Sequence, residues 1–174
     1  KKDEFSLLQI KPMTINSFNR EIIDNDIKND LLFCKSDIVL GNGKIEGIQN
    51  IIFIDPKTFH AEKTPEIAKE IEFYNKKLGS KKPYILAGPG RWGSADPWLG
   101  IPVTWKQISG ASAIIEMGIK DFPVDPSFGS HFFQNVTSMR LGYFTIDNNS
   151  KDESFDYNWL KKQKVVKNKK FTIC

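Results

Sequence analysis

The residues best suited to chemistry lie in a glycine-rich stretch near the middle of the chain. The sequence GPGRWG places Gly88, Gly90 and Gly93 around Arg91, directly after an apolar run typical of a buried strand. Glycine lacks a Cβ, so the backbone N–H groups of such a turn can approach an anion closely. The guanidinium of Arg91 adds a planar set of donors that fits a carboxylate or a phosphate. The pattern therefore indicates an anion site, with a purely structural loop as an equal alternative.

The residues that follow the glycines exclude two known phosphate-binding motifs. No Gly-Lys-Ser/Thr follows the glycines, so this is not a Walker phosphate loop, and Pro97 interrupts the helix that a dinucleotide fingerprint requires. We expect Asp96 to orient Arg91, and we expect the three tryptophans within residues 88–105 to wall the site or stack on a ring. In the structural alternative, the same tryptophans fill the core and Arg91 pairs internally.

His131 is the second candidate, because it lies where a helix is expected to begin. The sequence GSHFF puts Ser130 in position to cap that helix, with the imidazole near the free N–H groups of the first turn. Those donors and the helix dipole would stabilise a phosphoryl group on His131, to which Ser130 would donate. Arg140, near the end of the expected helix, is a second candidate anion contact. On position alone, a histidine packed between Phe132 and Phe133 without chemistry is the favoured alternative.

These residues depend on a framework of strands with one strongly indicated helix. Apolar runs predict strands at 5–12, 47–56, 81–90, 112–118 and 141–147. Thr64 as N-cap, Pro65 at the first helical position and Gly79 beyond the last turn delimit a helix whose apolar residues recur at helical spacing. Shorter helices are expected from Ser130 and within 156–162. Strands that alternate with helices favour a layered α/β domain.

The composition is that of one globular domain, or of one domain with a remnant of another. The chain has 174 residues, of which 40% are hydrophobic, enough to build a core. No apolar run approaches the roughly 18 residues of a membrane helix, and the first residues lack a signal-peptide core, so a cytoplasmic address without membrane contact is expected. Cys34 and Cys174 have no disulfide-framework or metal spacing and are expected to be reduced.

The basic residues of the chain make nucleic acid a partner to consider. The net charge is +4, and most of the surplus lies in KKQKVVKNKK, residues 161–170. A solvated lysine-rich surface is the favoured interpretation of this segment, and a nucleic-acid patch is the alternative. The chain has only two histidines, so a classical zinc site is not expected.

Residues 5–13 resemble the closing strand of the ATP-grasp nucleotide-binding domain in phosphoenolpyruvate synthase and pyruvate phosphate dikinase. That strand usually reads Gln-x-Arg-Pro, and FSLLQIKPM places Gln9 and Lys11 at the Gln and Arg positions, on one face of a strand. The resemblance implies that residues 1–13 are the edge of a domain that binds ATP with Mg²⁺, and that Gln9 and Lys11 serve the ATP phosphates. Lysine keeps the charge of arginine but loses its fork of donors.

A longer stretch, about residues 5–160, resembles the C-terminal region of phosphoenolpyruvate synthase-like, or PEP/pyruvate-binding, proteins. The motifs are LGNGKIEGIQNIIFIDPKTF, GPGRWGSADPWLGIPVTW and GSHFFQNVTS followed by GYFTI. In the dikinases, a swivelling domain carries a phosphohistidine in the pattern Gly-x-Thr-Ser-His-Ala-Ala, after a buried strand. His131 falls at that histidine, after ASAIIEMG, so the resemblance implies a swivelling α/β domain over residues 14–174.

Three functional expectations remain open. The first is that the chain is a C-terminal fragment of a phosphotransferase. In this expectation a neighbouring ATP-grasp domain passes a phosphoryl group from ATP to His131, and Arg91 holds a small anionic metabolite. The isolated chain is then expected to be inactive. The second is a non-catalytic anion-binding or interdomain regulatory module, favoured by Phe132 and Phe133 where the family has small residues. The third, a nucleic-acid surface at 161–170, is the least favoured.

Overall fold

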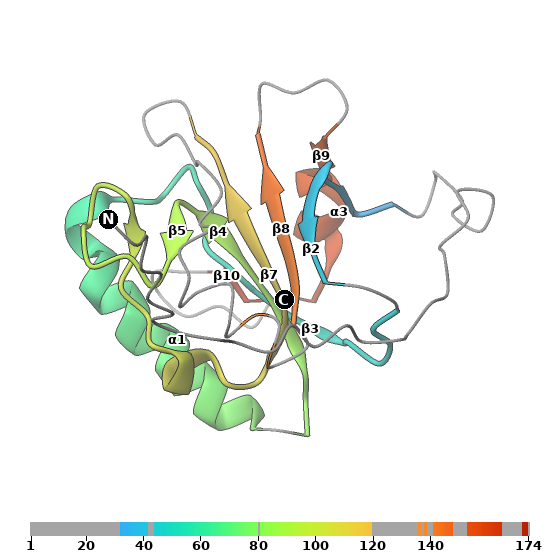
Figure 1. The fold of residues 1–174 in the computed structure, drawn as a ribbon, viewed down its shortest axis with the longest axis horizontal. Helices are drawn as coiled ribbons and strands as arrows, with labels where there is room; N and C mark the ends of the chain where they lie inside the picture. Colours follow the sequence, from blue (N-terminus) through green and yellow to red (C-terminus); the bar gives the residue numbers. More distant parts are fainter. Residues whose placement is uncertain are drawn as a thin grey trace, which may run out of the picture.

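The computed structural model describes residues 32–41, 44–79, 81–119, 136, 138, 141–147, 153–164 and 172–173. The strand expected at 5–12 and the domain boundary expected after residue 13 lie outside these residues. The described elements form a mixed α/β fold around a six-stranded sheet (Figure 1), which confirms the expected fold class at that level. None of the helices in the described residues is long and apolar enough to cross a membrane.

Four parallel strands form the centre of the sheet, and an antiparallel strand closes each side. The strand order is β10-β3-β4-β7-β8-β2. The bounds are β2 (Ile38–Leu40), β3 (Asn50–Phe53), β4 (Tyr84–Pro89), β7 (Ala111–Met117), β8 (Gly142–Ile146) and β10 (Thr172–Ile173). Strands β3, β4, β7 and β8 run parallel, whereas β10 and β2 run antiparallel to their neighbours. The carboxyl ends of the four parallel strands therefore meet along one border, here called the carboxyl edge.

The central strands are apolar because both faces of the sheet are covered. Strands β4 and β7 are buried along nearly their whole length, as expected of parallel strands with packing on both sides. Leu86 and Ile114 face the layer that holds the long helix, whereas Ala87 and Ile115 face the opposite layer. By the same alternation, Glu116 points toward the helix side.

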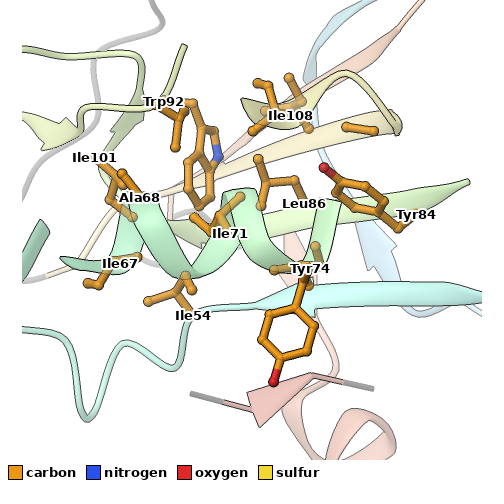
Figure 2. Close-up of a cluster of buried hydrophobic side chains, with 14 of the residues drawn as sticks. Ile54, Ile67, Ala68, Ile71, Tyr74, Tyr84, Leu86, Trp92, Ile101 and Ile108 are labelled. Carbon is orange, nitrogen blue, oxygen red and sulfur yellow. The ribbon is translucent and has the colours of Figure 1, made fainter. Parts of the chain in front are cut away.

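Helix α1 (Thr64–Leu78) covers one face of the sheet. Its apolar stripe, which includes Ile67, Ala68 and Ile71, is buried there, and Figure 2 shows these side chains between the helix and the strands. A helix that connects two neighbouring parallel strands is the usual crossover of an α/β fold, and here α1 lies between β3 and β4. The 3.6-residue spacing of the sequence therefore predicted both the helix and its buried face.

The two ends of α1 test the capping predictions. The prediction that Thr64 is the N-cap is wrong: the 3-10 helix η3 (Ala61–Lys63) leads directly into α1, so Lys63 occupies the N-cap position and Thr64 is already helical. The prediction that Gly79 ends the helix is confirmed. Gly79 has φ 63°, and its N–H donates to the Asn75 carbonyl at 2.9 Å, a conformation that glycine adopts without strain.

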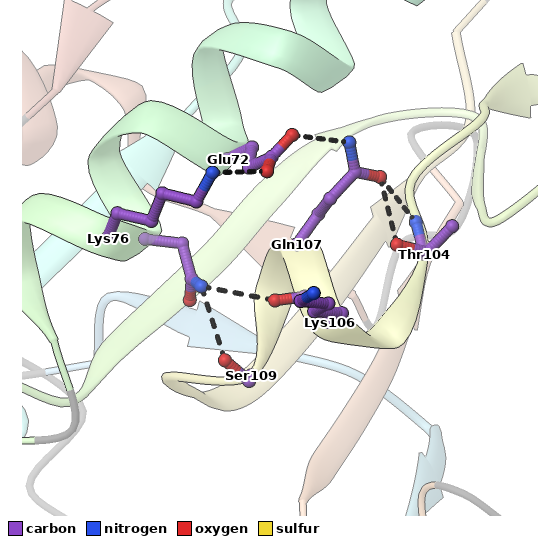
Figure 3. Close-up of polar contacts among 7 residues, drawn as sticks. Glu72, Lys76, Thr104, Lys106, Gln107 and Ser109 are labelled. Carbon is purple, nitrogen blue, oxygen red and sulfur yellow. Dashed lines mark hydrogen bonds and ion pairs between the residues drawn. The ribbon is translucent and has the colours of Figure 1, made fainter.

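The 3-10 helix η4 (Trp105–Ile108) fastens the end of the glycine-rich stretch to α1. Figure 3 shows Glu72 of α1 accepting a hydrogen bond from Nε2 of Gln107 at 3.0 Å. Oε1 of Gln107 accepts from the N–H of Thr104 at 2.8 Å. These contacts hold the chain in a fixed place before it enters β7.

The opposite face of the sheet is covered by a small aromatic layer. Strand β1 (Cys34–Lys35) pairs antiparallel with β9 (Ser154–Phe155), next to helix α3 (Tyr157–Lys162). Phe53 of the sheet stacks on Phe155 with ring centroids 5.6 Å apart. Figure 1 shows α3 on the other side of the sheet from α1, so the core consists of two hydrophobic layers with the sheet between them.

Candidate functional site

The glycine-rich stretch folds back on itself at the carboxyl edge. After β4 ends at Pro89, β5 (Arg91–Trp92) pairs in parallel with β6 (Gly100–Ile101), and Arg91 lies opposite Gly100. A Cβ on Gly100 would lie 1.9 Å from the Arg91 carbonyl oxygen, so only glycine fits at this position. The glycines and prolines of this stretch indicated a loop, but the structure contains a short two-stranded parallel ladder within it.

The backbone donors of this stretch are occupied by acceptors from within the chain. Each of the four successive residues 90–93 donates its N–H. Gly90 donates to the Met117 carbonyl at 3.1 Å, Arg91 to the Leu99 carbonyl at 2.9 Å, Trp92 to Oε1 of Glu116 at 2.9 Å and Gly93 to the Ile101 carbonyl at 2.8 Å. The side-chain acceptor found at these donors is the carboxyl group of Glu116. The N–H groups of Gly90 and Gly93 are therefore engaged within the chain and are not open to an external anion.

Gly88 serves the packing of Trp92. A Cβ on Gly88 would lie 2.9 Å from Cβ of Ile54 and 3.1 Å from the indole ring of Trp92. Trp92 is 2% exposed, belongs to the core on the α1 side (Figure 2), and donates through Nε1 to the Ile115 carbonyl at 3.0 Å. The structural interpretation of the stretch is thus confirmed for Trp92, whereas Trp98 is 73% exposed.

Glu116 lies at the centre of the site. Its side chain is fully buried near the end of β7, between Gly88 of β4 and Thr145 of β8 in the strand register. Oε1 accepts from the Trp92 N–H, and Oε2 accepts from the Tyr143 hydroxyl at 2.7 Å. Oγ1 of Thr145 donates in turn to the Tyr143 hydroxyl oxygen at 3.0 Å. One carboxyl group therefore connects β5, β7 and β8.

Burial sets the acidity of Glu116. Removal from water raises the pKa of Glu116 from 4.5 to about 7, against the opposing effects of the Tyr143 hydroxyl, the Trp92 N–H and the positive charge of Arg91. The group therefore exchanges its proton near neutral pH, as catalytic and switch residues do. Both carboxyl oxygens hold hydrogen bonds inside the core, so the geometry favours a positioning role over contact with a substrate.

Arg91 is half-buried, and its charge acts on Glu116. Asp96 has a different role from the expected one of orienting Arg91. Its Oδ1 accepts from the Trp98 N–H at 2.9 Å, and its carbonyl accepts from the Leu99 N–H at 3.0 Å. Asp96 therefore shapes the turn that leads into β6, and Arg91 is positioned by the β5–β6 ladder.

The structure brings part of the predicted site together. Gly88, Gly90, Arg91 and Gly93 gather at the carboxyl edge. Other predicted residues lie outside the described part of the chain: Gln9, Lys11, Ser130, His131, Arg140 and residues 165–170 of the basic segment. Glu116, Tyr143 and Thr145 were not predicted as site residues from the sequence. The signal available for Glu116 was an acidic residue within the otherwise apolar strand SAIIEMG.

The fold and the site together define a mixed α/β domain with a buried, hydrogen-bonded carboxyl at the carboxyl edge of its sheet. Within the described residues, no group of three or more His, Cys, Asp or Glu side chains could hold a metal ion. Comparison of the chain with known protein families, with curated proteins and with solved structures gives no match. The resemblance to phosphoenolpyruvate synthase-like proteins therefore rests on the sequence motifs alone.

Proposed function

We propose that the chain is the C-terminal, swivelling part of a phosphoenolpyruvate synthase-like phosphotransferase, in which His131 carries a phosphoryl group. The observation that best supports this proposal is the position of Arg91 and Glu116 at the carboxyl edge, because ligands of parallel α/β sheets bind outside the carboxyl ends of the strands. The segment that contains His131 leaves β7 at this same edge. It starts at Gly118, whose N–H donates to the Ile146 carbonyl at 2.9 Å.

The proposed transfer uses histidine as a covalent carrier. A neighbouring ATP-grasp domain, closed by residues 5–12, binds ATP with Mg²⁺. The imidazole of His131 attacks a phosphorus atom of ATP, so that an N–P bond forms while the P–O bond to the leaving group breaks. Ser130 and Arg140 hold the phosphoryl oxygens, and Arg91 holds the small anionic metabolite that accepts the group.

Glu116 acts in this scheme through Arg91. By accepting the Trp92 N–H at 2.9 Å, it fixes the residue that follows Arg91 in the chain. Its charge also attracts the Arg91 guanidinium. Glu116 is therefore a positioning residue, and its replacement should change the affinity for the anionic metabolite more than the loading of His131.

Phosphoryl transfer from labelled ATP tests the carrier role. The full-length protein, including the proposed ATP-grasp domain, is incubated with ATP labelled at the β phosphate, as the wild type, as His131→Ala and as His60→Ala. His60 is exposed and is the other histidine of the chain, which makes it the matched control. The proposal predicts acid-labile label on the wild type and on His60→Ala, and its loss in His131→Ala. Equal label on His131→Ala, or none on the wild type, contradicts it.

A non-catalytic module that binds a small anionic metabolite or docks the ATP-grasp domain is the second candidate. It is favoured by the N–H groups of residues 90–93, which are engaged with internal acceptors rather than left open for a phosphate. Its signature is absence of label together with saturable binding of phosphoenolpyruvate in calorimetry. That binding should be lost in Arg91→Gln and kept in Lys106→Gln, which removes an exposed cation from η4.

A further inference from the structure

A cavity lies on the face of the sheet opposite α1, among residues that the proposed phosphotransfer does not use. The chain that leaves β3 forms one wall, and the start of α3 forms the other. Its volume is about 470 Å³, within the roughly 300–1,000 Å³ of typical small-molecule sites. The cavity is thus large enough for a ligand with one or two rings.

The floor of the cavity is aromatic. Phe53 and Phe155 stack at 5.6 Å, and the Tyr157 ring lies 4.9 Å from that of Phe155. Leu160, which is buried, completes the apolar lining. Aromatic rings of this kind offer a flat ligand both apolar contact and offset or edge-to-face packing.

The rim of the cavity carries two aspartates, which accept hydrogen bonds from the backbone, and two lysines, which form no ion pair among the described residues. Oδ1 of Asp55 accepts from the Lys57 N–H at 2.9 Å, and Oδ1 of Asp156 accepts from two N–H groups of α3 at 2.9 and 2.8 Å. The ammonium groups of Lys57 and Lys161 have no carboxylate partner among the described residues. One oxygen of each rim carboxylate is therefore engaged by backbone N–H groups, whereas the two lysine ammonium groups are available to a ligand.

We propose that this cavity binds a flat, apolar molecule that carries a carboxylate or phosphate group. The ring lies against Phe155 and Tyr157, and the anionic group lies between Lys57 and Lys161. The cavity does not include Arg91 or Glu116, so this proposal does not depend on the proposed phosphotransfer.

Three probes with one ring system test this proposal on the 174-residue chain. Naphthoate, naphthyl phosphate and the neutral naphthamide are titrated while backbone amide signals are followed by NMR. At least one anionic probe should bind saturably and shift the signals of Phe155 and Tyr157, several-fold more tightly than naphthamide does. The tighter of the two anionic probes identifies the preferred anionic group.

Lysine variants separate charge recognition from general apolar binding. Lys57→Gln and Lys161→Gln should each weaken the anionic probe roughly two- to fivefold, the range for an exposed ion pair, and leave naphthamide unchanged. Lys106→Gln, on the opposite side of the sheet, should change neither. The proposal is overturned by equal binding of naphthamide, by unchanged affinity in both lysine variants, or by absence of saturable binding up to millimolar probe.

Discussion

Replacing Glu116 by glutamine should make the folding stability of the chain less sensitive to pH. Glutamine keeps the shape of the side chain, an acceptor for the Trp92 N–H and a polar partner for the Tyr143 hydroxyl. It cannot ionise. The variant therefore removes the proton equilibrium of Glu116 while most of the local hydrogen bonding persists.

The sign and size of the effect come from the pKa of Glu116. Folding raises this pKa from 4.5 to about 7, so between these values the folded chain binds more protons than the unfolded chain. The stabilisation is therefore complete below pH 4.5 and is lost as pH rises through about 7. One pKa unit corresponds to about 1.4 kcal/mol, so wild type should lose about 2.5 kcal/mol between pH 5 and 8 through this group alone.

Urea denaturation of both proteins at pH 5 and pH 8 measures this effect. The stability of Glu116→Gln relative to wild type should rise by about 2.5 kcal/mol from pH 5 to pH 8. Glu62→Gln, which changes an exposed acid on η3, is the matched control and should show no such rise. A constant difference between Glu116→Gln and wild type across this range would refute the reasoning, because it would mean that the pKa of Glu116 is the same in both states.

Three other contacts can be tested by substitution or by chemical modification. Tyr143→Phe leaves Oε2 of Glu116 without its donor, so the free energy of unfolding measured in urea should fall by about 1–3 kcal/mol. The decrease should be larger at pH 8, where the carboxyl is ionised, than at pH 5. An equal decrease at both pH values would contradict the role of the ionised carboxyl. Gly100→Ala drives a Cβ against the Arg91 carbonyl oxygen, and it should therefore destabilise the chain more than Gly47→Ala, where φ is 77° but nothing lies within 4 Å of the added atom; thermal unfolding of the two variants checks the order. Burial, reinforced by the charge of Glu153, raises the pKa of the Cys34 thiol to about 12, so in a Cys174→Ser background a thiol reagent at pH 8 should modify Cys34 much more slowly in the folded chain than in urea.

Elements specified by local pattern were predictable from the sequence. The stripe of Ile67 and Ile71 predicted α1 and its buried face, and the apolar run SAIIEMG predicted β7. The short helix expected within 156–162 is confirmed as α3, because Asp156 is a strong N-cap whose side chain satisfies two free N–H groups. The error at Thr64 arose because η3 extends the helical turn backwards, which no single residue signals.

The site was only partly predictable because its partners are distant in sequence. Glu116 accepts from residues 24 and 27 positions away, Trp92 and Tyr143, so no local motif contains the network. The β5–β6 ladder likewise depends on the close approach of Arg91 to Gly100. Glycine density indicated a tight turn correctly, but it could not show whether the anion at that turn is a ligand or a side chain of the chain itself.

The engagement of residues 90–93 has a consequence for the dynamics of the carboxyl edge. Glycine-rich segments usually belong to the least protected parts of a protein in amide hydrogen exchange, because they open locally without disturbing the core. Here, opening the segment would break the bond between the Trp92 N–H and a carboxyl that is itself tied to β8. The segment should therefore exchange together with the sheet, as part of one cooperative unit, and any movement at this edge must come from neighbouring segments.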